Sequence, residues 1–501
     1  MPVPAHPTRR SLLFGTAGTA VLLGAGARTR FGTDARPSIA AVAAREPIVP
    51  AAHTSVRLDA APGTVELGSR EVHTWGFGER VPGPEIRVAA GGTVAARLHN
   101  RLPAETTVHW HGVRIDPAMD GAPGVSQTPV PPGGDFHYRF VAPDPGTYFY
   151  HSHVGTQLDR ALYGALIVED PAEPLGYDAD WTVVLDDWID GTGTDPDAVL
   201  AELRDQPRTA QTMESALLGG TAGHVAYPHY LVNGRTAAAP EEFTCSPGRR
   251  VRLRLINAGA DTAFRVALGD HRLTVTHTDG FPVLPVTVDT LLVGMGERYD
   301  VLVTLADGVF PLVADAEGKN ARAFAVIRTA PGDAPTASVA VPEADGRLLT
   351  LADLVADPCV DRGDAPARGV DLVLGRGPNG TRWTLGTAAA PDAGPLRVPV
   401  DTGERVRLSF TNTTRMWHPV HLHGHTFQVR SATGRGPRKD TVMVRPRETV
   451  TVDVLADNPG EWMLHCHNLY HSELGMMATL GYGATPTTPD ASMPNMTRDF
   501  A

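Results

Sequence analysis

The stretch His465-Cys466-His467-Asn468-Leu469-Tyr470-His471-Ser472-Glu473-Leu474-Gly475-Met476 holds one cysteine between two histidines, with a third histidine and a methionine behind them. A thiolate, two imidazoles and a weakly bound thioether are the ligands of a blue copper electron-transfer site. In a β-strand, successive side chains point to opposite faces. Cys466 would therefore face one copper while His465 and His467 face away from it, which predicts a second metal centre on the other side of the strand.

Three further His-x-His pairs supply the rest of this second centre, and each would place two imidazoles on one face of a strand. With the first pair they give eight histidines: His109 and His111, His151 and His153, His421 and His423, and His465 and His467. His418 remains, and it completes the blue copper site with Cys466 and His471. One pair alone would be an ordinary histidine doublet, but chance does not explain four pairs with matched offsets.

An internal repeat explains the spacing of the pairs. The pattern Gly-x-x-Val-(x5)-Asn occurs three times, at residues 91–100, 248–257 and 403–412, within the apolar–polar alternation of half-buried strands. The first and third copies each place a His-x-His pair nine residues after the asparagine, and each places a second pair at the same offset from Pro-Gly. These two copies are therefore predicted to pack together and close around one cluster.

The middle copy has lost the histidines. Its corresponding positions hold Val266, Leu268, Val313 and Asp315. We expect it to keep the fold without the metal, with the segment 296–301 as a strand. The first copy lacks the blue copper ligands, because Ser152, Thr106, Gln157 and Leu162 stand where Cys466, His418, His471 and Met476 stand in the third.

These motifs resemble those of the three-domain bacterial multicopper oxidases, the family of laccases and copper-efflux oxidases. His-Trp-His-Gly, His-Ser-His, His-Pro-Val-His-Leu-His-Gly and His-Cys-His-(x3)-His-(x4)-Met match its four copper motifs, and the resemblance covers roughly residues 50 to 485. It implies four copper ions per monomer. Type 1 copper would take His418, Cys466 and His471 with Met476 axial; type 2 copper would take His109 and His421; one type 3 copper would take His111, His151 and His467, and the other His153, His423 and His465.

Composition agrees with an all-β chain, because 43 prolines and 52 glycines suit strand-and-turn domains of Greek-key type. With the resemblance, this predicts three cupredoxin-like Greek-key β-sandwich or barrel domains at residues 46–170, 171–335 and 336–485. Residues 1–45 would form a signal and disordered N-terminus, and residues 486–501 a flexible tail. The best helix candidate is 197–208.

The N-terminal residues predict export. Thr8-Arg9-Arg10-Ser11-Leu12-Leu13 is a twin-arginine pattern before an apolar run that is too short for a spanning helix. We expect twin-arginine export to an extracellular, cell-wall or periplasmic location, with no membrane span in the mature form; the cleavage site stays open. The formal net charge of −12 argues against a nucleic-acid surface.

Two cysteines remain beside Cys466. In an exported protein Cys245 and Cys359 could form a disulfide, or both could be isolated buried thiols, which we favour. Sequence alone cannot bring their Cα atoms into bonding range. Three domains suffice to build every site, so a monomer is expected, although the sequence leaves the oligomeric state open.

The resemblance also implies a reaction. A reducing substrate gives single electrons to type 1 copper through whichever of His471 and His418 reaches solvent, Cys466 carries them onward, and the cluster reduces O2 to two waters. Asp120 resembles the acidic residue near the cluster in this family, although an Asp before Gly121 also suits a simple turn. Ser472, with Glu473 next to it, stands where bacterial relatives often carry an acid, so the second proton donor stays open. A Met axial ligand predicts a type 1 potential in the low-to-middle part of the family's range.

The substrate is the main open question. We expect an oxidase of phenols or similar aromatic reductants, and Cu(I) is the rival substrate. The scattered methionines weaken the case for Cu(I). A copper-free structural relative, a copper nitrite reductase and a simple electron carrier are disfavoured, because none of them needs four intact His-x-His pairs. Trp417 and Tyr470, beside ligands, could line the substrate pocket or belong to the core.

Overall fold

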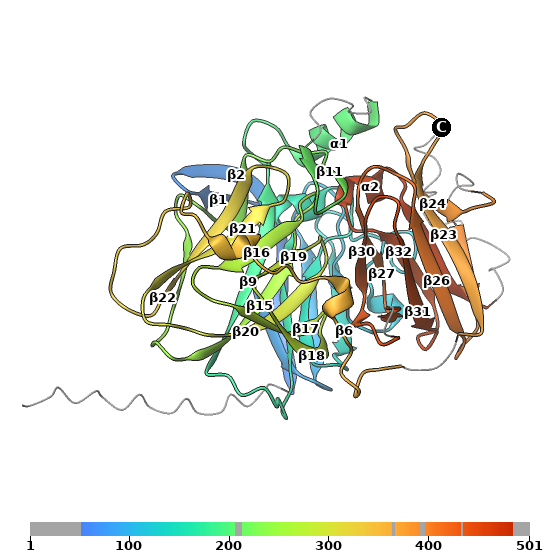
Figure 1. Ribbon diagram of the computed structural model, residues 1–501. Coiled ribbons are helices and arrows are strands. Elements are labelled where there is room, and N and C mark those ends of the chain that lie inside the picture. Colours follow the sequence, from blue (N-terminus) through green and yellow to red (C-terminus); the bar gives the residue numbers. More distant parts are fainter. Residues whose placement is uncertain (1–51, 206–212, 363–365, 391–395, 432–433, 484–501) are drawn as a thin grey trace, which may run out of the picture. The chain divides into compact units, whose positions relative to one another are not determined.

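The computed structural model describes residues 52–205, 213–362, 366–390, 396–431 and 434–483. The expected N-terminal signal and C-terminal tail lie outside these ranges. Within them, none of the helices has the length and apolar character needed to cross a membrane. Strands dominate, as expected, and they fall into three consecutive groups that Figure 1 separates by colour.

The first group contains two four-stranded sheets. One has the order β2 (Arg70–Phe77), β1 (His53–Leu67), β4 (Thr93–Asn100), β6 (Asp135–Val141). The other has the order β3 (Ile86–Ala89), β8 (Tyr163–Glu169), β7 (Gly146–His151), β5 (His109–His111). Two 3₁₀ turns follow the ligand strands, η1 (Pro117–Met119) and η2 (Gln157–Arg160).

The second group contains a seven-stranded and a five-stranded sheet. The larger has the order β13 (Arg235–Thr236), β12 (His229–Val232), β9 (Ala179–Trp188), β15 (Arg250–Asn257), β20 (Arg298–Thr304), β17 (Leu273–Thr278), β18 (Phe281–Val288). The smaller has the order β14 (Glu241–Thr244), β22 (Ala321–Arg328), β21 (Val309–Ala316), β16 (Phe264–Leu268), β19 (Thr290–Val293). Between β9 and β12 lie α1 (Pro196–Asp205) and the hairpin of β10 (Met213–Ser215) and β11 (Gly220–Gly223).

The third group contains a six-stranded and a five-stranded sheet, after the 3₁₀ turns η3 (Pro342–Asp345) and η4 (Leu351–Asp353). The larger has the order β24 (Trp383–Thr387), β23 (Arg368–Arg376), β26 (Arg405–Asn412), β31 (Thr449–Leu455), β28 (Phe427–Val429), β29 (Arg438–Lys439). The smaller has the order β25 (Leu396–Val400), β33 (Met477–Tyr482), β32 (Glu461–Cys466), β27 (His418–Leu422), β30 (Thr441–Val444). The short helix α2 (Leu469–Glu473) joins β32 to β33.

The repeated asparagines explain why the three groups share one sequence pattern. In Asn100, Asn257 and Asn412, the side-chain amide donates to two backbone carbonyls, one four or five residues later and one 30–36 residues later. Each Oδ1 also accepts the backbone N–H two residues on. A buried backbone group without a partner is costly. The asparagine therefore satisfies the turn that follows the same strand in every copy.

The predicted alternation is confirmed in β26, where Val406, Leu408 and Phe410 are fully buried and their neighbours are not. The middle copy keeps its strands but not their register. In the outer copies, the first histidines of the two pairs face each other across adjacent strands. The corresponding residues of the middle copy are Val266 and Val313, but Val266 pairs with Ala314 instead. A slip of one residue turns side chains to the other face. Val266, Leu268 and Val313 pack in the core.

One helix, one strand boundary and two cysteines can be compared with the sequence predictions. The predicted helix begins at Pro196 and continues to Asp205, and its last three expected residues lie outside the described ranges. The strand expected from Gly296 begins only at Arg298, because Gly296 adopts a φ of +80° and forms the preceding turn. Cys245 and Cys359 are free thiols, and Cys359 is exposed, so the expectation of two buried thiols was wrong.

Candidate metal centre

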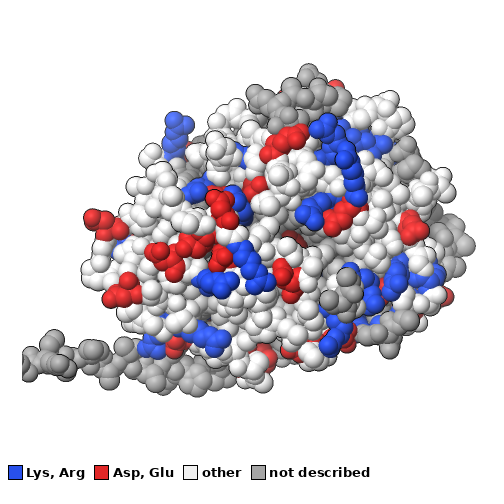
Figure 2. Space-filling view, in the orientation of Figure 1, with Lys and Arg blue, Asp and Glu red and all other residues white. Residues whose placement is uncertain are grey.

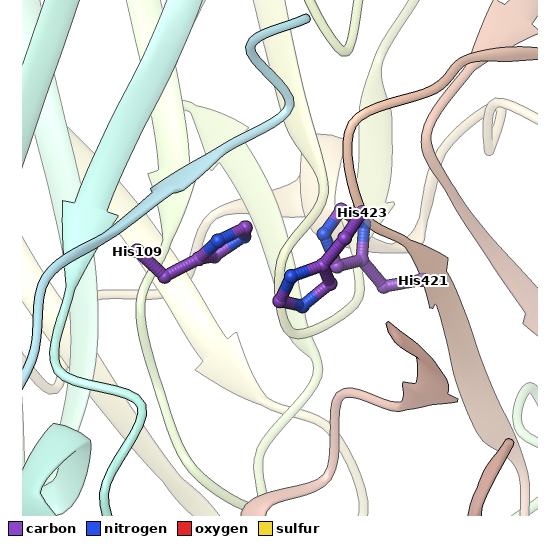
Figure 3. A group of neighbouring side chains, drawn as sticks. All are labelled: His109, His421 and His423. Carbon is purple, nitrogen blue, oxygen red and sulfur yellow. The ribbon is translucent and has the colours of Figure 1, made fainter. Parts of the chain in front are cut away.

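The eight paired histidines converge between the first and third groups of strands. Figure 3 shows His109 reaching from β5 towards His421 and His423, which come from the other side on β27 and the turn after it. The rings of His109 and His423 stack at a centroid distance of 3.7 Å, and those of His111 and His421 at the same distance. The sequence prediction that the outer copies meet at one cluster is confirmed.

Antiparallel pairing aligns the histidines on each side. His109 pairs with His151 across β5 and β7, and His421 pairs with His465 across β27 and β32. In three of the four pairs the second histidine lies just past the end of its strand, rather than within it as predicted. Its side chain still reaches the same cluster, since the rings of each pair are 5.0–5.8 Å apart.

The ligand nitrogens form several compact groups, each with its atoms within 4.8 Å of one another. One group is the expected trio of His153, His423 and His465. The other expected trio is not reproduced as a group. His467 lies near its partners, at ring distances of 4.9 Å from His111 and 5.4 Å from His151, but His111 and His151 group with His109 instead.

The hydrogen bonds of the imidazoles test whether this cluster fits a metal. The Nδ1 atoms of His109, His151, His421 and His465 lie 2.8–3.0 Å from backbone carbonyl oxygens, so each Nδ1–H donates outward. A neutral imidazole then carries its lone pair on Nε2. The Nε2 atoms of the first three are buried without a hydrogen-bond partner, as are both nitrogens of His467. These lone pairs can be satisfied by a cation.

His423 and His465 also present nitrogen lone pairs, and these face each other directly. Nδ1 of His423 donates to the Asp120 carboxylate at 2.9 Å, so His423, like His465, carries its lone pair on Nε2. The Nε2 atoms of His423 and His465 lie 3.1 Å apart. Burial lowers the pKa of both imidazoles well below their usual range, which opposes protonation as a remedy. Two facing lone pairs fit a shared or adjacent metal ion.

The predicted blue copper ligands also come together. Nδ1 of His418 and Nδ1 of His471 are 3.1 Å apart, and each lies 3.6 Å from Sγ of Cys466. Burial raises the pKa of the Cys466 thiol, so it keeps its proton until a metal displaces it. Met476 is fully buried, and its backbone carbonyl accepts the N–H of Cys466. Nitrogen and sulfur donors in this arrangement suit copper.

The first copy shows what replaces that site. Thr106, Ser152 and Gln157, at the positions equivalent to the three ligands, hydrogen-bond to one another at 2.6–3.2 Å. The triad therefore satisfies its own polar atoms in the place where the third copy presents a thiol and two imidazoles.

Asp120 lies beside the cluster, as the resemblance implies. Its carboxylate accepts from Nδ1 of His423 and lies 3.2 Å from Nδ1 of His109, and it is almost completely buried. Burial opposes its ionisation, yet the facing His423 and His109 hold the pKa of Asp120 well below its usual range. Partners of this kind fix the tautomer and orientation of metal-binding imidazoles.

Sequence reasoning missed a second acidic residue, Asp440. Its Oδ1 accepts from Nε2 of His111 at 3.1 Å, which leaves Nδ1 of His111 buried without a partner. Arg298, from β20, donates to both oxygens of Asp440 at 2.7 and 2.6 Å. Neither residue lies in a histidine motif, so only the contact across strand groups reveals them.

The glycine that follows two of the histidine pairs has a steric reason. Gly112 and Gly424 have φ values of +83° and +62°. A Cβ at Gly112 would lie 2.4 Å from Arg298, and one at Gly424 would lie 2.2 Å from the ring of Trp462. Both the backbone conformation and the space therefore require glycine.

The condition for direct electron entry at His471 or His418, an imidazole edge that reaches solvent, is not met. His418 and His471 are completely buried, and Trp383 packs against both. Trp417 and Tyr470 are also completely buried; Trp417 donates to the carbonyl of Ala222, and the Tyr470 hydroxyl donates to Asp159. The sequence did not predict a role for Trp383, because the hairpin of β23 and β24 that carries it contains no copper motif and lies far from the ligands in sequence.

The two candidates for the second proton donor lie together. Ser472 and Glu473 line a narrow cavity that also contacts His153 and His465. The Ser472 hydroxyl lies 3.4 Å from Nδ1 of His465, and burial raises the pKa of Glu473 to about 7.

Comparison with known proteins identifies the family. Models of multicopper oxidase domains match residues 60–173, 179–331 and 370–484. The chain is 46% identical over 433 residues to the multicopper oxidase MmcO of Mycobacterium tuberculosis, covering 84% of this chain and 85% of that protein. It is 26% identical over 536 residues to copper resistance protein A of Escherichia coli, covering 79% of this chain and 87% of that protein.

Solved structures agree on the fold. A laccase from B. aclada superposes with a TM-score of 0.72 at 25% identity, over 89% of each chain. A multi-copper oxidase from Pseudomonas parafulva superposes with a TM-score of 0.67 at 31% identity, over 85% of this chain and all of that one. The expected cupredoxin-like fold is thereby confirmed.

Proposed function

The chain belongs to the multicopper oxidase family, and from that premise we propose that it couples the one-electron oxidation of a phenolic or other aromatic reductant to the four-electron reduction of O2 to water. The observation that carries the proposal is the strand end at residues 465–467. Cys466 meets His418 and His471 on one side, while His465 and His467 meet the histidine cluster on the other.

We assign the ligands as follows. Type 1 copper would be held by His418, Cys466, His471 and Met476, and type 2 copper by His109 and His421. One type 3 copper would be held by His111, His151 and His467, and the other by His153, His423 and His465. The unpartnered, buried nitrogens support this assignment. Copper in these positions supplies one-electron oxidation of the reductant and reduction of O2.

The chain's own residues position and connect these sites. The peptide links between Cys466 and its two neighbours give a short covalent path from the type 1 ligands to the cluster. Asp120 orients His109 and His423, and Asp440 orients His111. Burial keeps the imidazoles neutral, which is the form that binds a metal.

Cu(I) is the second candidate substrate, because one relative carries the name copper resistance protein A. A copper-free structural role is disfavoured, since an apolar core would not tolerate eight clustered imidazoles, five of which have unpartnered nitrogens.

We also propose that the protein is exported by the twin-arginine route to an extracellular, cell-wall or periplasmic location, on the basis of Arg9 and Arg10. Replacement of both by lysine should leave the precursor in the cytoplasm; unchanged export would refute this route.

The function is tested with copper-loaded protein and a Cys466→Ser variant. The parent should show the blue thiolate-to-copper band, and O2 uptake should match one O2 per four electrons withdrawn, without peroxide. The variant should lose the blue band while keeping copper in the cluster. A parent that binds copper but consumes no O2 with either phenols or Cu(I) would contradict the proposal.

A further inference from the structure

Two aromatic side chains pack against the buried type 1 ligands: Trp383, and the partly exposed His224, whose ring lies 5.4 Å from that of His471. The ring of Trp383 lies 3.8 Å from that of His471, with an interplanar angle of 34°, and 5.2 Å from that of His418. Both histidines are completely buried, whereas Trp383 is 3% exposed. An electron from a molecule that docks beside the indole can pass through it to His471.

The other side of the indole carries a cation. The guanidinium carbon of Arg376 lies over the ring of Trp383, 3.9 Å from its centroid. Two groups this close to one ring cannot share a face, so the indole is held between Arg376 and His471. Arg376 is exposed, and its Nη1 donates to the carbonyl of Gly380 at 2.7 Å.

The hairpin that carries both residues is docked firmly. Arg376 and Trp383 are paired across β23 and β24, and β24 is the edge strand of its sheet. The backbone N–H of Trp383 donates to the carbonyl of Leu474, at the end of α2, at 2.9 Å. Because α2 also carries His471, this bond fixes the indole to the ligand helix.

The charge around this surface favours anions. In the part of the chain that the structure describes, no carboxylate forms an ion pair with Arg376. The protein as a whole carries −12, and Figure 2 shows acidic and basic side chains interspersed over the face drawn. Since screening limits exposed charges to about 8–10 Å at physiological salt, the local guanidinium decides which charge is attracted.

We propose that Trp383 and Arg376 form the electron-entry surface of the type 1 site, and that this surface selects aromatic reductants carrying a negative group, such as phenolates, carboxylates or sulfonates, over cationic reductants such as metal ions. The proposal rests on the proposed oxidase function and names its substrate class. The reductant's anionic group pairs with the guanidinium, and its ring stacks on the outer face of that guanidinium; arginine makes both kinds of contact. The indole beneath the guanidinium then carries the electron inward.

Each docking event withdraws one electron from the reductant through Trp383 and His471. A phenol that loses an electron releases its O–H proton to solvent, and a phenolate or sulfonated donor releases none. Four such events, with four protons taken from water, balance the reduction of one O2 to two waters. A cationic metal ion would instead meet the positive charge of the guanidinium, which repels it.

The test uses copper-loaded holoprotein with Arg376→Glu, Arg376→Gln and Trp383→Leu, and Arg101→Glu as a control with the same charge change on an exposed arginine of the first strand group. Anaerobic stopped-flow bleaching of the blue band gives the bimolecular rate with an anionic donor, hexacyanoferrate(II) or a sulfonated aromatic amine, and with a cationic N-methylated phenylenediamine. The reduction potential of the type 1 site is measured for each variant, so that driving force can be separated from docking.

Arg376→Glu should slow the anionic donors about tenfold or more at low salt, speed the cationic donor, and invert the salt dependence. The rates of Arg376→Gln should lie between those of the parent and those of Arg376→Glu. The control Arg101→Glu should change neither the anionic nor the cationic rate. Trp383→Leu should slow both classes of donor at an unchanged potential. Equal effects of Arg376→Glu on the anionic and cationic donors, or unchanged rates in Arg376→Glu or Trp383→Leu, would overturn the proposal.

A second measurement does not depend on copper. Copper-free protein is titrated with a redox-inert naphthalene sulfonate, and quenching of tryptophan fluorescence is recorded. Saturable quenching that is lost in Arg376→Glu and Trp383→Leu but kept in the control is expected. Quenching that is the same in all variants would contradict the docking surface, whereas absence of a blue band in the parent would contradict only the proposed function.

Discussion

Replacing Arg298 by methionine tests how the second strand group supports the metal cluster. Arg298 and Asp440 are completely buried and joined by two short hydrogen bonds. Removing one partner of such a pair costs about 3–5 kcal/mol, because the other charge is left in a poorly solvated interior. Asp440 would keep its contacts with His111 and Thr441, so a loss of about 3–4 kcal/mol is expected.

The assay is differential scanning calorimetry of the copper-free protein at a fixed scan rate, since unfolding of a chain of this size is often irreversible. For a cooperative unit of about 150–250 residues, the size of one strand group, the factor is about 2–4 °C per kcal/mol. The apparent unfolding temperature of the transition that involves Arg298 should therefore fall by roughly 6–16 °C. The control is Arg347→Met, which removes a half-exposed pair with Asp353 and should shift the temperature by less than about 2 °C.

A double variant tests whether the two buried charges depend on each other. Arg298→Met with Asp440→Asn removes both charges, so its loss should be smaller than the sum of the two single losses. Additive losses, or a drop below about 2 °C for Arg298→Met, would refute the view that this buried pair holds the second and third strand groups together.

Three further predictions follow from other contacts. Asp300 has a pKa of about 2, because the attraction of Arg252 and Arg254 outweighs the effect of burial. Its ionised form should therefore contribute about 2 kcal/mol of stability above pH 4, and this contribution should be lost as the pH falls towards 2. Calorimetry should show Asp300→Asn to be less stable than the parent at neutral pH, with the difference in unfolding temperature shrinking in acid; a difference that does not change with pH would contradict this. Gly424→Ala should lower the unfolding temperature of both copper-free and copper-loaded protein, because its Cβ would overlap Trp462; an unchanged temperature would show that the turn can relax. Asp120→Ala should lower copper retention or turnover about 10–100-fold, as loss of a carboxylate behind metal-binding imidazoles does, measured by copper analysis after dialysis; full retention and turnover would remove its orienting role.

Much of the site could be predicted because it is local in sequence. The two-residue period of a strand places His465 and His467 opposite Cys466, and the spacing of Asn412 and His421 matches that of Asn100 and His109. A repeat also reveals which copies must meet. None of this requires knowledge of how distant segments pack.

The residues that escaped prediction depend on such packing. Asp440 and Arg298 meet across two strand groups, and Trp383 reaches His471 only because its hairpin bonds to Leu474. The burial of His418 and His471 likewise follows from that hairpin and not from their motif. One strand boundary failed for a related reason: Gly296 adopts a left-handed conformation and packs so closely against His467 and His111 that a Cβ there would lie within 3.0 Å of both rings.

The most direct test of the central claim is a crystal structure of the copper-loaded protein with anomalous scattering recorded at the copper edge. One anomalous peak is expected between His418, Cys466 and His471, and three more among the eight paired histidines. A map with no peak beside Cys466, or with a single peak in the cluster, would contradict it.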